Sequence, residues 1–316
     1  MSDLFQHALA AVRAASSVCQ RVQADLVNAR TLEKGDKSPV TVADFAAQAI
    51  VCHLLREATP DLPVVGEEGA AELRQPDHAA LAEQVAHHAG LDPDAMLAAI
   101  DHGGHDPAAG DSGPYWTLDP IDGTKGFLRG DQYAVALGLI EGGKPVLGVL
   151  GCPNLDGGAC FGGDGETATR WSLGDAAEAE AELRVSPVGK VGEAVFCESV
   201  ESGHTKQDAS ARIAERLGIG AEPYRIDSQC KYAAVAMGRA QVYLRLPTRP
   251  GYVERIWDHA AGHAVIASAG GVVTDVEGKP LDFGQGRGLE NNRGVIVTAG
   301  DTDFHGRVLD AVQAEL

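Results

Sequence analysis

Two aspartates, Asp119 and Asp122, lie where regular secondary structure is expected to end. They follow an apolar run at 115–118 that is typical of a buried strand, they flank a proline, and a glycine comes directly after them. Because proline fixes its own φ and glycine permits unusual backbone angles, the segment can be stiff enough to aim both carboxylates and the Ile121 carbonyl at one point. The fold must therefore place a rigid acidic loop at the end of this strand, where functional residues are often found.

Three further acidic segments stand at the end of an expected strand or near the start of an expected helix: Glu67 and Glu68 after a strand at 62–65, Asp258 in a helix from about Trp257 to Ala269, and Asp44 in a helix from Thr41 to about Glu57. Each feature alone is common in proteins: Asp-Gly occurs in turns, Asp occurs in the first turn of helices, and a Glu-Glu pair often lies on the surface. Two like charges about 4 Å apart, however, repel by roughly 4 kcal/mol at an effective dielectric near 20. A cluster of these carboxylates would need protons or divalent cations, and hard oxygen ligands select magnesium or manganese.

The charge of the chain excludes some classes of partner. Forty-five acids against 26 bases give a formal net charge of −19, so the overall field repels nucleic-acid polymers and anionic membrane surfaces. A phosphorylated substrate would also be repelled, so an anion site must be locally basic, lie at a helix N-terminus, or be charged by a metal. We expect a cytoplasmic protein, because the sequence contains neither a membrane-spanning apolar run nor a signal pattern.

Cysteine and histidine do not indicate a zinc site. The cysteines form no Cys-x-x-Cys pair, and we expect reduced structural thiols: Cys19, Cys52, Cys152, Cys160, Cys197 and Cys230. Five histidines lie between His78 and His105, within a stretch from Ala70 to Gly113 that we interpret as a peripheral, partly helical insertion.

Hydrophobic periodicity divides the chain near residue 180. Before this point it predicts a helix at 4–26, a hairpin of strands at 133–140 and 145–152, and a shorter ribbon around 162–165. Beyond it, strands and helices alternate: strand 195–198, helix 207–217, strand 224–226, helix 230–237, strand 241–246, the helix containing Asp258, and strands 272–275 and 295–298. That alternation favours a layered α/β second half.

Four segments resemble the signatures of the inositol monophosphatase superfamily, which comprises lithium-sensitive, magnesium-dependent phosphatases: Asp119 to Thr124 (Asp-Pro-Ile-Asp-Gly-Thr), Trp257 to Gly262 (Trp-Asp-His-Ala-Ala-Gly), Gly66 to Glu68, and Thr41 to Asp44. The resemblance spans nearly the whole chain. It implies an α+β fold, the layered αβαβα sandwich of the inositol monophosphatase and fructose-1,6-bisphosphatase type.

Within the superfamily, the segment Gly123 to Gly130 resembles the 3′(2′),5′-bisphosphate nucleotidases, because inositol enzymes typically carry Asn before the Phe. The segments 198–204, 227–232, 243–247 and 281–284 and the long stretch between Glu68 and Asp119 extend the match. The implied activity is magnesium-dependent hydrolysis of the 3′(2′)-phosphate of adenosine 3′(2′),5′-bisphosphate. Its sulfated relative, 3′-phosphoadenosine 5′-phosphosulfate, presents the same 3′-phosphate and stays an open alternative.

The resemblance also implies a set of metal ligands. Glu67, Asp119 and the Ile121 carbonyl would hold one Mg²⁺, and Asp119, Asp122 and Asp258 a second. Glu67 with waters would hold a third, and Mn²⁺ is a possible substitute. These ions would create a positive site inside a negative protein.

The remaining implied roles concern the base and the substrate. Asp44 would accept the proton of the attacking water, with Thr124 hydrogen-bonded between them. The residues expected around the nucleotide and its retained phosphate are His204, Ser228, Lys231 and Arg245. On this interpretation residues 1–180 form an N-terminal α+β domain with the metal-ligand loops and the base, and residues 181–316 form a C-terminal α/β domain with the nucleotide-binding residues and Asp258.

Two alternatives stay open at this point. An inositol (poly)phosphate 1-phosphatase or a fructose-1,6-bisphosphatase could keep the same metal centre. A non-catalytic nucleotide-binding sensor is a different class, and the intact Asp44, Thr124 and carboxylate ligands argue against it. The expected partner is a small bisphosphorylated nucleotide, with no nucleic-acid polymer and no membrane; a monomer is compatible with the sequence, which leaves the oligomeric state open.

Overall fold

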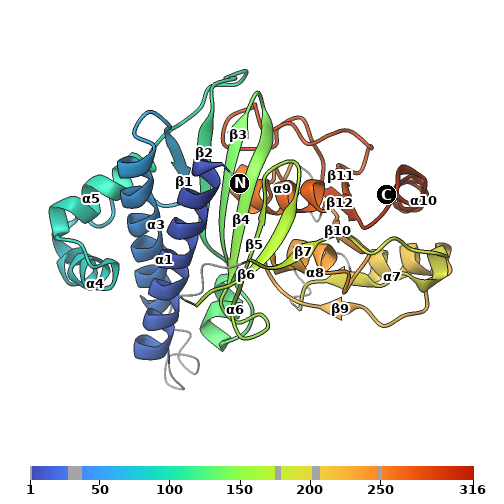
Figure 1. The fold of residues 1–316 in the computed structure, drawn as a ribbon, viewed down its shortest axis with the longest axis horizontal. Helices are drawn as coiled ribbons and strands as arrows, with labels where there is room; N and C mark the ends of the chain where they lie inside the picture. Colours follow the sequence, from blue (N-terminus) through green and yellow to red (C-terminus); the bar gives the residue numbers. More distant parts are fainter. Residues whose placement is uncertain (1, 28–37, 175–178, 201–206, 248, 250) are drawn as a thin grey trace.

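Helical layers alternate with two sheets in the computed structural model, which describes residues 2–27, 38–174, 179–200, 207–247, 249 and 251–316 (Figure 1). Helices α1 (Asp3–Leu26) and α3 (Ser38–Ala58) cover one face of the first sheet. Helices α8 (Cys230–Ala236) and α9 (Ala260–Ser268) lie between the two sheets, and α7 (Gln207–Arg216) and α10 (Thr302–Gln313) cover the outer face of the second. The predicted αβαβα sandwich is confirmed.

The first sheet has its strands in chain order, with β1 parallel to β2 and every later neighbour antiparallel. Its strands are β1 (Val64–Gly66), β2 (Tyr115–Asp122), β3 (Ala134–Glu141), β4 (Lys144–Cys152), β5 (Ala159–Gly163), β6 (Ala168–Ser172) and β7 (Ala179–Leu183).

The second sheet has the order β11-β12-β10-β8-β9. Its strands are β8 (Phe196–Glu198), β9 (Tyr224–Arg225), β10 (Val242–Arg245), β11 (Val272–Thr274) and β12 (Val295–Thr298). The chain passes from one sheet to the other between Leu183 and Phe196. The division into domains 1–180 and 181–316 stays a prediction, because α9 of the second half packs on the first sheet.

Period-two alternation along the strands builds separate cores between the layers. On β3, Val135 and Leu137 join the core under α1 and α3, whereas Ala134 and Ala136 join the core shared with α8 and α9. The strands β10 and β12 divide their side chains in the same way between the inner core and the core under α7 and α10. Burial on both faces explains why these strands read as continuous apolar runs.

Helix α9 lies close against the first sheet because glycines face it. A Cβ atom at Gly148 would stand 2.4 Å from the Ala261 carbonyl oxygen, and one at Gly138 would stand 2.9 Å from the Cβ of Ala260. The 3₁₀ turn η3 (Ile256–Asp258) leads directly into this helix. Close packing of α9 therefore fixes where Asp258 lies.

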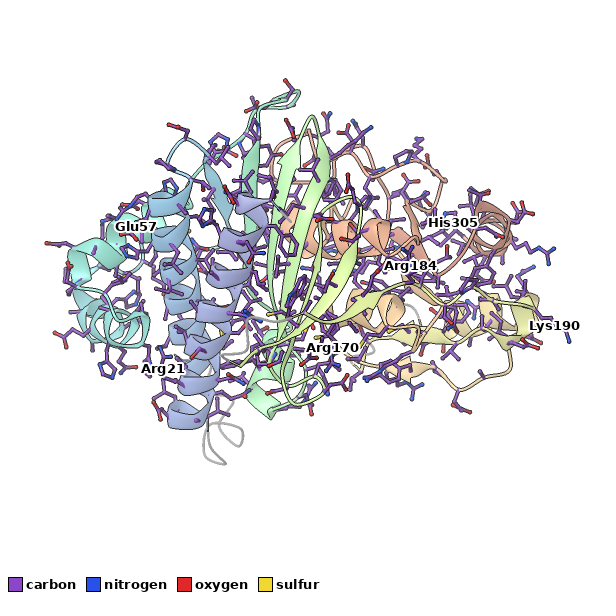
Figure 2. All side chains as sticks on the ribbon, in the orientation of Figure 1. Arg21, Glu57, Arg170, Arg184, Lys190 and His305 are labelled. Atoms are coloured by element: carbon purple, nitrogen blue, oxygen red, sulfur yellow. The ribbon has the colours of Figure 1, made fainter. Side chains whose placement is uncertain are left out.

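Side chains of the outer helices make hydrogen bonds to neighbouring elements. Figure 2 labels two of these side chains, Arg21 and His305. His305 of α10 hydrogen-bonds Thr274 of β11 and Thr298 of β12, both at 2.9 Å. Arg21 of α1 donates a 2.9 Å hydrogen bond to the carbonyl of His88 in α4 (Ala79–Ala89). All six cysteines are buried and free of disulfides, as expected. No helix within the described ranges is both long and apolar enough to span a membrane.

Several element boundaries differ from the prediction. Helix α3 begins at Ser38 rather than Thr41, and helix α10 was not predicted. Strand β2 does not end before Asp119 but runs to Asp122, with a register shift between these two aspartates. The shift accommodates the intervening proline, which has no N–H to give to the ladder.

The stretch 70–113 is partly helical, as predicted, but it is not wholly peripheral. It contains η1 (Pro76–His78), α4 and α5 (Pro93–His102). After α5 the chain returns to the sheet, where Gly104 forms an antiparallel bridge with Val65. The end of the insertion therefore covers the free edge of β1, directly beside the acidic loop that follows this strand.

Candidate active site

A cavity of about 290 Å³ opens where the ends of β1 and β2 meet α3, α6 (Thr124–Arg129), α8 and η3. All predicted site residues except His204, which lies outside the described residues, line this one cavity: Asp44, Glu67, Asp119, Ile121, Asp122, Thr124, Ser228, Lys231, Arg245 and Asp258. Segments that are far apart in the sequence therefore converge, as the acid pattern predicted.

The carboxylates face one another closely enough to disturb their ionisation. Burial raises the pKa of Asp119 well above its usual value, and Glu67, Asp122, Asp258 and Asp44 raise it further. Burial also raises the pKa of Asp44 and of Asp258. Glu67 lies at the rim of the cavity and is partly open to solvent. The hydration that it does lose, and then the charges of nearby acids, raise its pKa to about 7. Burial and mutual proximity thus disfavour the charged forms of these carboxyls, and a bound cation would offset that penalty.

One buried oxygen in this cluster has no hydrogen-bond partner among the described residues. This atom is Asp119 Oδ1, although the Asp119 carboxyl hydrogen-bonds Glu67. A buried polar atom without a partner costs free energy, and such an atom needs an explanation. Carboxylate oxygens of this kind are the donors that Mg²⁺ and Mn²⁺ prefer, so the residues present fit a divalent cation.

A second, tighter group that includes two acids forms part of the cavity wall. Within the part of the chain that the structure describes, the ligand atoms of Glu254, Asp258 and His259 lie within 4.8 Å of one another. Glu254, however, accepts from Arg245 at 3.1 Å and lies 3.4 Å from His259 Nε2. Although burial opposes it, the His259 hydrogen bond and the Arg245 charge lower the pKa of Glu254 to about 2. We interpret this group as an ion-pair network that orients Arg245.

The basic side of the cavity comes from the second half of the chain. Lys231 of α8 is buried, with Nζ 5.3 Å from the centroid of the Tyr243 ring. Burial lowers the pKa of Lys231, against the opposing attraction of Asp122. Arg245, at the end of β10, uses Nε for Glu254 and is partly exposed to the cavity. These two cations provide the local positive charge that an anion site in this acidic protein requires.

Thr124 begins α6 directly after Gly123, whose φ of 93° is left-handed. A Cβ atom at Gly123 would also stand 2.9 Å from the Cβ of Ser228. Both the backbone angle and the lack of space therefore favour glycine at this position. Within the described ranges Thr124 makes no direct hydrogen bond to Asp44, and the proton relay expected between them stays a prediction.

Gln229, which the sequence did not single out, joins the two halves of the site. Its backbone N–H donates to Asp122 Oδ2 at 2.6 Å, and its side chain donates to the Trp257 carbonyl at 2.9 Å and accepts from Gly262 N at 3.1 Å. This one buried residue therefore ties the end of β2 to the start of α9. Only its position beside Ser228 could have suggested a role from the sequence.

Gln48 of α3 fixes the acidic loop after β1. Its side-chain amide accepts from the Glu68 N–H at 2.9 Å and donates to the Glu68 carbonyl at 2.6 Å. A Cβ atom at Gly66 would stand 2.6 Å from Gln48 Oε1, so the loop lies directly on this side chain. The buried glutamine thereby sets the direction in which Glu67 points.

We expect Gln48→Leu to lower the free energy of unfolding by about 1–3 kcal/mol, because it leaves backbone groups of Glu68 without partners. Urea unfolding of the metal-free protein measures the change. Gln75→Leu is the matched control, because Gln75 is exposed and, within the described ranges, its side chain makes a single 3.5 Å hydrogen bond, to the Ala71 carbonyl. Equal losses in the two variants would show that Gln48 does not hold the loop.

The raised carboxyl pKa values predict a specific dependence of stability on pH. An acid whose folded pKa exceeds its unfolded value stabilises the fold at low pH, and this contribution is lost as the pH rises through the folded pKa. For Glu67 the window runs from 4.5 to about 7. In EDTA, wild-type protein should therefore lose more unfolding free energy between pH 5 and pH 8 than Glu67→Gln does.

The same urea titrations with Mg²⁺ provide the check on this account. A cation that binds only the folded state should restore stability at pH 8. If wild-type and Glu67→Gln proteins show the same pH dependence in EDTA, the pKa of Glu67 is not raised by loss of hydration and by the neighbouring acids.

Comparison with known proteins agrees with this geometry. The chain matches the Inositol monophosphatase family over residues 1–314. A 3′(2′),5′-bisphosphate nucleotidase from Schizosaccharomyces pombe is 42% identical, over 92% of this chain and 90% of the relative. One of the same name from Oryza sativa is 42% identical, over 91% and 88%.

Solved structures share the fold. The extragenic suppressor protein suhB from Bartonella henselae superposes with a TM-score of 0.65 at 21% identity, over 99% of each chain. CysQ from Bacteroides thetaiotaomicron, a bacterial member of the inositol monophosphatase family, superposes with a TM-score of 0.63 at 24% identity, over 94% of this chain and 97% of its own.

Proposed function

Because the chain belongs to the inositol monophosphatase family, we propose that it is a 3′(2′),5′-bisphosphate nucleotidase that releases the 3′(2′)-phosphate of adenosine 3′(2′),5′-bisphosphate. The observation that carries this proposal is the cavity itself: carboxylates from separate segments surround a buried oxygen of Asp119 that has no partner in the described part of the chain, and Lys231 and Arg245 line the same cavity. Bound cations would neutralise the carboxylates, and the retained phosphate of the substrate would neutralise Lys231 and Arg245.

The acidic side would hold Mg²⁺, in two or three sites, with Mn²⁺ as a possible substitute. The residues that would hold the ions are Glu67, Asp119, Asp122, Asp258 and the Ile121 carbonyl. When bound, Mg²⁺ lowers the pKa of water and neutralises phosphate oxygens, so that a water-derived nucleophile can attack phosphorus at neutral pH.

Asp44 is the proposed general base. It projects from α3 into the cavity, where burial and then Glu68 and Glu67 raise its pKa. A raised pKa makes a carboxylate a better proton acceptor, provided that it is ionised when substrate is bound. Thr124 lines the same cavity and would pass the hydrogen bond between the water and Asp44.

The second half of the chain would recognise the nucleotide. Lys231 and Arg245 would bind the retained phosphate through charge-assisted hydrogen bonds, and Ser228 and His204 would contact the rest of the ligand. Ser228 has a left-handed backbone (φ 64°), and its hydroxyl donates to the Asp227 carbonyl at 2.6 Å and accepts from Cys230 N at 3.1 Å. Its placement is therefore well defined.

Arg245→Met should raise KM for adenosine 3′,5′-bisphosphate by about 10- to 100-fold, the value of one lost hydrogen bond between charged groups. The KM for adenosine 3′-phosphate should change much less, because that ligand lacks the second phosphate. Arg245→Met/Glu254→Gln is the matched variant, since it also removes the buried carboxylate that loses its Arg245 partner in the single change. Equal KM increases for both ligands would show that Arg245 does not contact the retained phosphate.

A magnesium-dependent phosphate-release panel tests the function. It compares adenosine 3′,5′-bisphosphate, 3′-phosphoadenosine 5′-phosphosulfate, inositol 1,4-bisphosphate and fructose 1,6-bisphosphate at equal concentrations, each with and without lithium. We expect the adenosine bisphosphate to give the highest kcat/KM and lithium to inhibit. Faster turnover of the inositol or fructose compound would contradict the proposal, and no turnover of any compound would favour a binding protein.

A further inference from the structure

We propose that Arg287 is a positioning residue for the metal site. Its guanidinium joins the loop that carries Glu67 to the turn that carries Asp258, and it thereby sets the affinity of the cavity for divalent cations. This inference rests on the proposed function, since it concerns the same carboxylates.

The contacts of Arg287 come from segments that are distant in the sequence. Nη2 donates a 2.6 Å hydrogen bond to the Gly66 carbonyl, directly before Glu67. Nη1 donates to the His105 carbonyl at 3.3 Å, and Cζ lies 4.7 Å from the centroid of the Trp257 ring, directly before Asp258. One planar group therefore touches the residues that precede two of the proposed ligands.

Each contact is itself held in place by the backbone. Gly66 N donates to the Gly103 carbonyl at 2.7 Å, so the end of β1 is paired on its outer edge. Ile256 N donates to the Arg287 carbonyl at 3.2 Å, and Arg255 forms an antiparallel bridge with Gly288. Because the backbone of residue 287 is tied to the Asp258 turn, the guanidinium is a side-chain link from that turn to the Glu67 loop, and a change at Arg287 removes it.

Arg287 donates its hydrogen bonds to backbone carbonyls and not to the carboxylates of the cluster. Within the described ranges it forms no ion pair with a carboxylate, although Glu67 and Asp106 attract it over a longer distance. A guanidinium bonded to Glu67 would compete with a cation for the same oxygens. Bonding to carbonyls instead orders the loop and leaves the carboxylate free. Lysine cannot replace this arrangement, because a single ammonium lacks the planar fork that spans two carbonyls and stacks on an indole.

The test compares Arg287→Met with Arg255→Met in the full chain. Arg255 is the matched control, because its Cζ also lies over Trp257, at 5.8 Å, but it is exposed and makes no hydrogen bond to Gly66 among the described residues. Calorimetric titration with Mn²⁺, without substrate, measures cation affinity directly. We expect Arg287→Met to weaken binding by about 10- to 100-fold, the usual effect of losing an outer-shell partner, and Arg255→Met by less than about threefold. Equal affinities in the two variants would overturn the inference.

Thermal unfolding in EDTA separates positioning from general stability. If Arg287→Met fails to fold, Arg287→Lys undergoes the same titration, and Mn²⁺ affinity like that of the wild type would overturn the inference. A wild-type protein that binds Mn²⁺ but cleaves none of the panel substrates would contradict only the proposed function, because the titration involves no substrate.

Discussion

Asp44→Asn should lower kcat for adenosine 3′,5′-bisphosphate by about 10²- to 10⁴-fold, the range typical of losing a general base. Asparagine keeps the size of the side chain and removes its ability to accept a proton. The effect should be confined to turnover, because Asp44 is not among the proposed metal ligands. Steady-state phosphate release at saturating Mg²⁺ measures kcat, and calorimetric titration with Mn²⁺ shows whether the ions still bind.

Asp94→Asn is the matched control for this change, because Asp94 is an exposed residue in the first turn of α5. It should leave kcat and Mn²⁺ affinity unchanged. An Asp44→Asn protein with kcat within threefold of the wild type would refute the role of Asp44 as the base. Loss of Mn²⁺ binding together with activity would instead assign Asp44 to the metal site.

Asp119→Asn should have the largest effect of all, a loss of phosphate release by at least about 10³-fold. Cations contribute several kcal/mol of charge stabilisation in the transition state, and each 1.36 kcal/mol is a factor of ten in rate. Asp119 lies in the middle of the cluster, where four other acids affect its ionisation and where one of its oxygens has no partner within the described ranges. Mn²⁺ binding should be lost with the activity.

The metal-free stability of Asp119→Asn should change in the opposite direction. Removing the most buried acid of the cluster relieves repulsion among its remaining carboxylates, so the free energy of unfolding in EDTA at pH 8 should rise. Urea unfolding with and without Mg²⁺ measures both effects, and Asp94→Asn again serves as the control. An Asp119→Asn protein that is active within tenfold of the wild type, or less stable in EDTA, would contradict the account of the cluster.

Residues whose role depends on local pattern could be predicted from the sequence. Asp119, Glu67 and Asp258 stand next to the ends of apolar runs, and both strand and helix periodicity can be read over a few residues. The resemblance to a family then assigned chemistry to them. The exact end of β2 was predicted wrongly because a proline usually ends a strand, whereas here it lies at a register shift that needs no N–H donor.

Residues whose role depends on contacts between distant segments could not be predicted. Gln48 occupies an ordinary position in a helical pattern, and only the packing of the Gly66 loop against α3 gives its amide partners. Gln229 and Arg287 likewise bond to carbonyls, which every residue has and no motif marks. Backbone partners of this kind are set by tertiary structure, so local periodicity carries no signal for them.

We expect carboxylates from separate parts of the chain to form one cation site that serves phosphate hydrolysis. Anomalous diffraction from crystals soaked in Mn²⁺ tests it most directly. We predict manganese peaks inside the cavity, in contact with Asp119 and with Glu67, Asp122 or Asp258. Manganese bound only by Glu254 and His259, or absent from the cavity at saturating concentration, would contradict the claim.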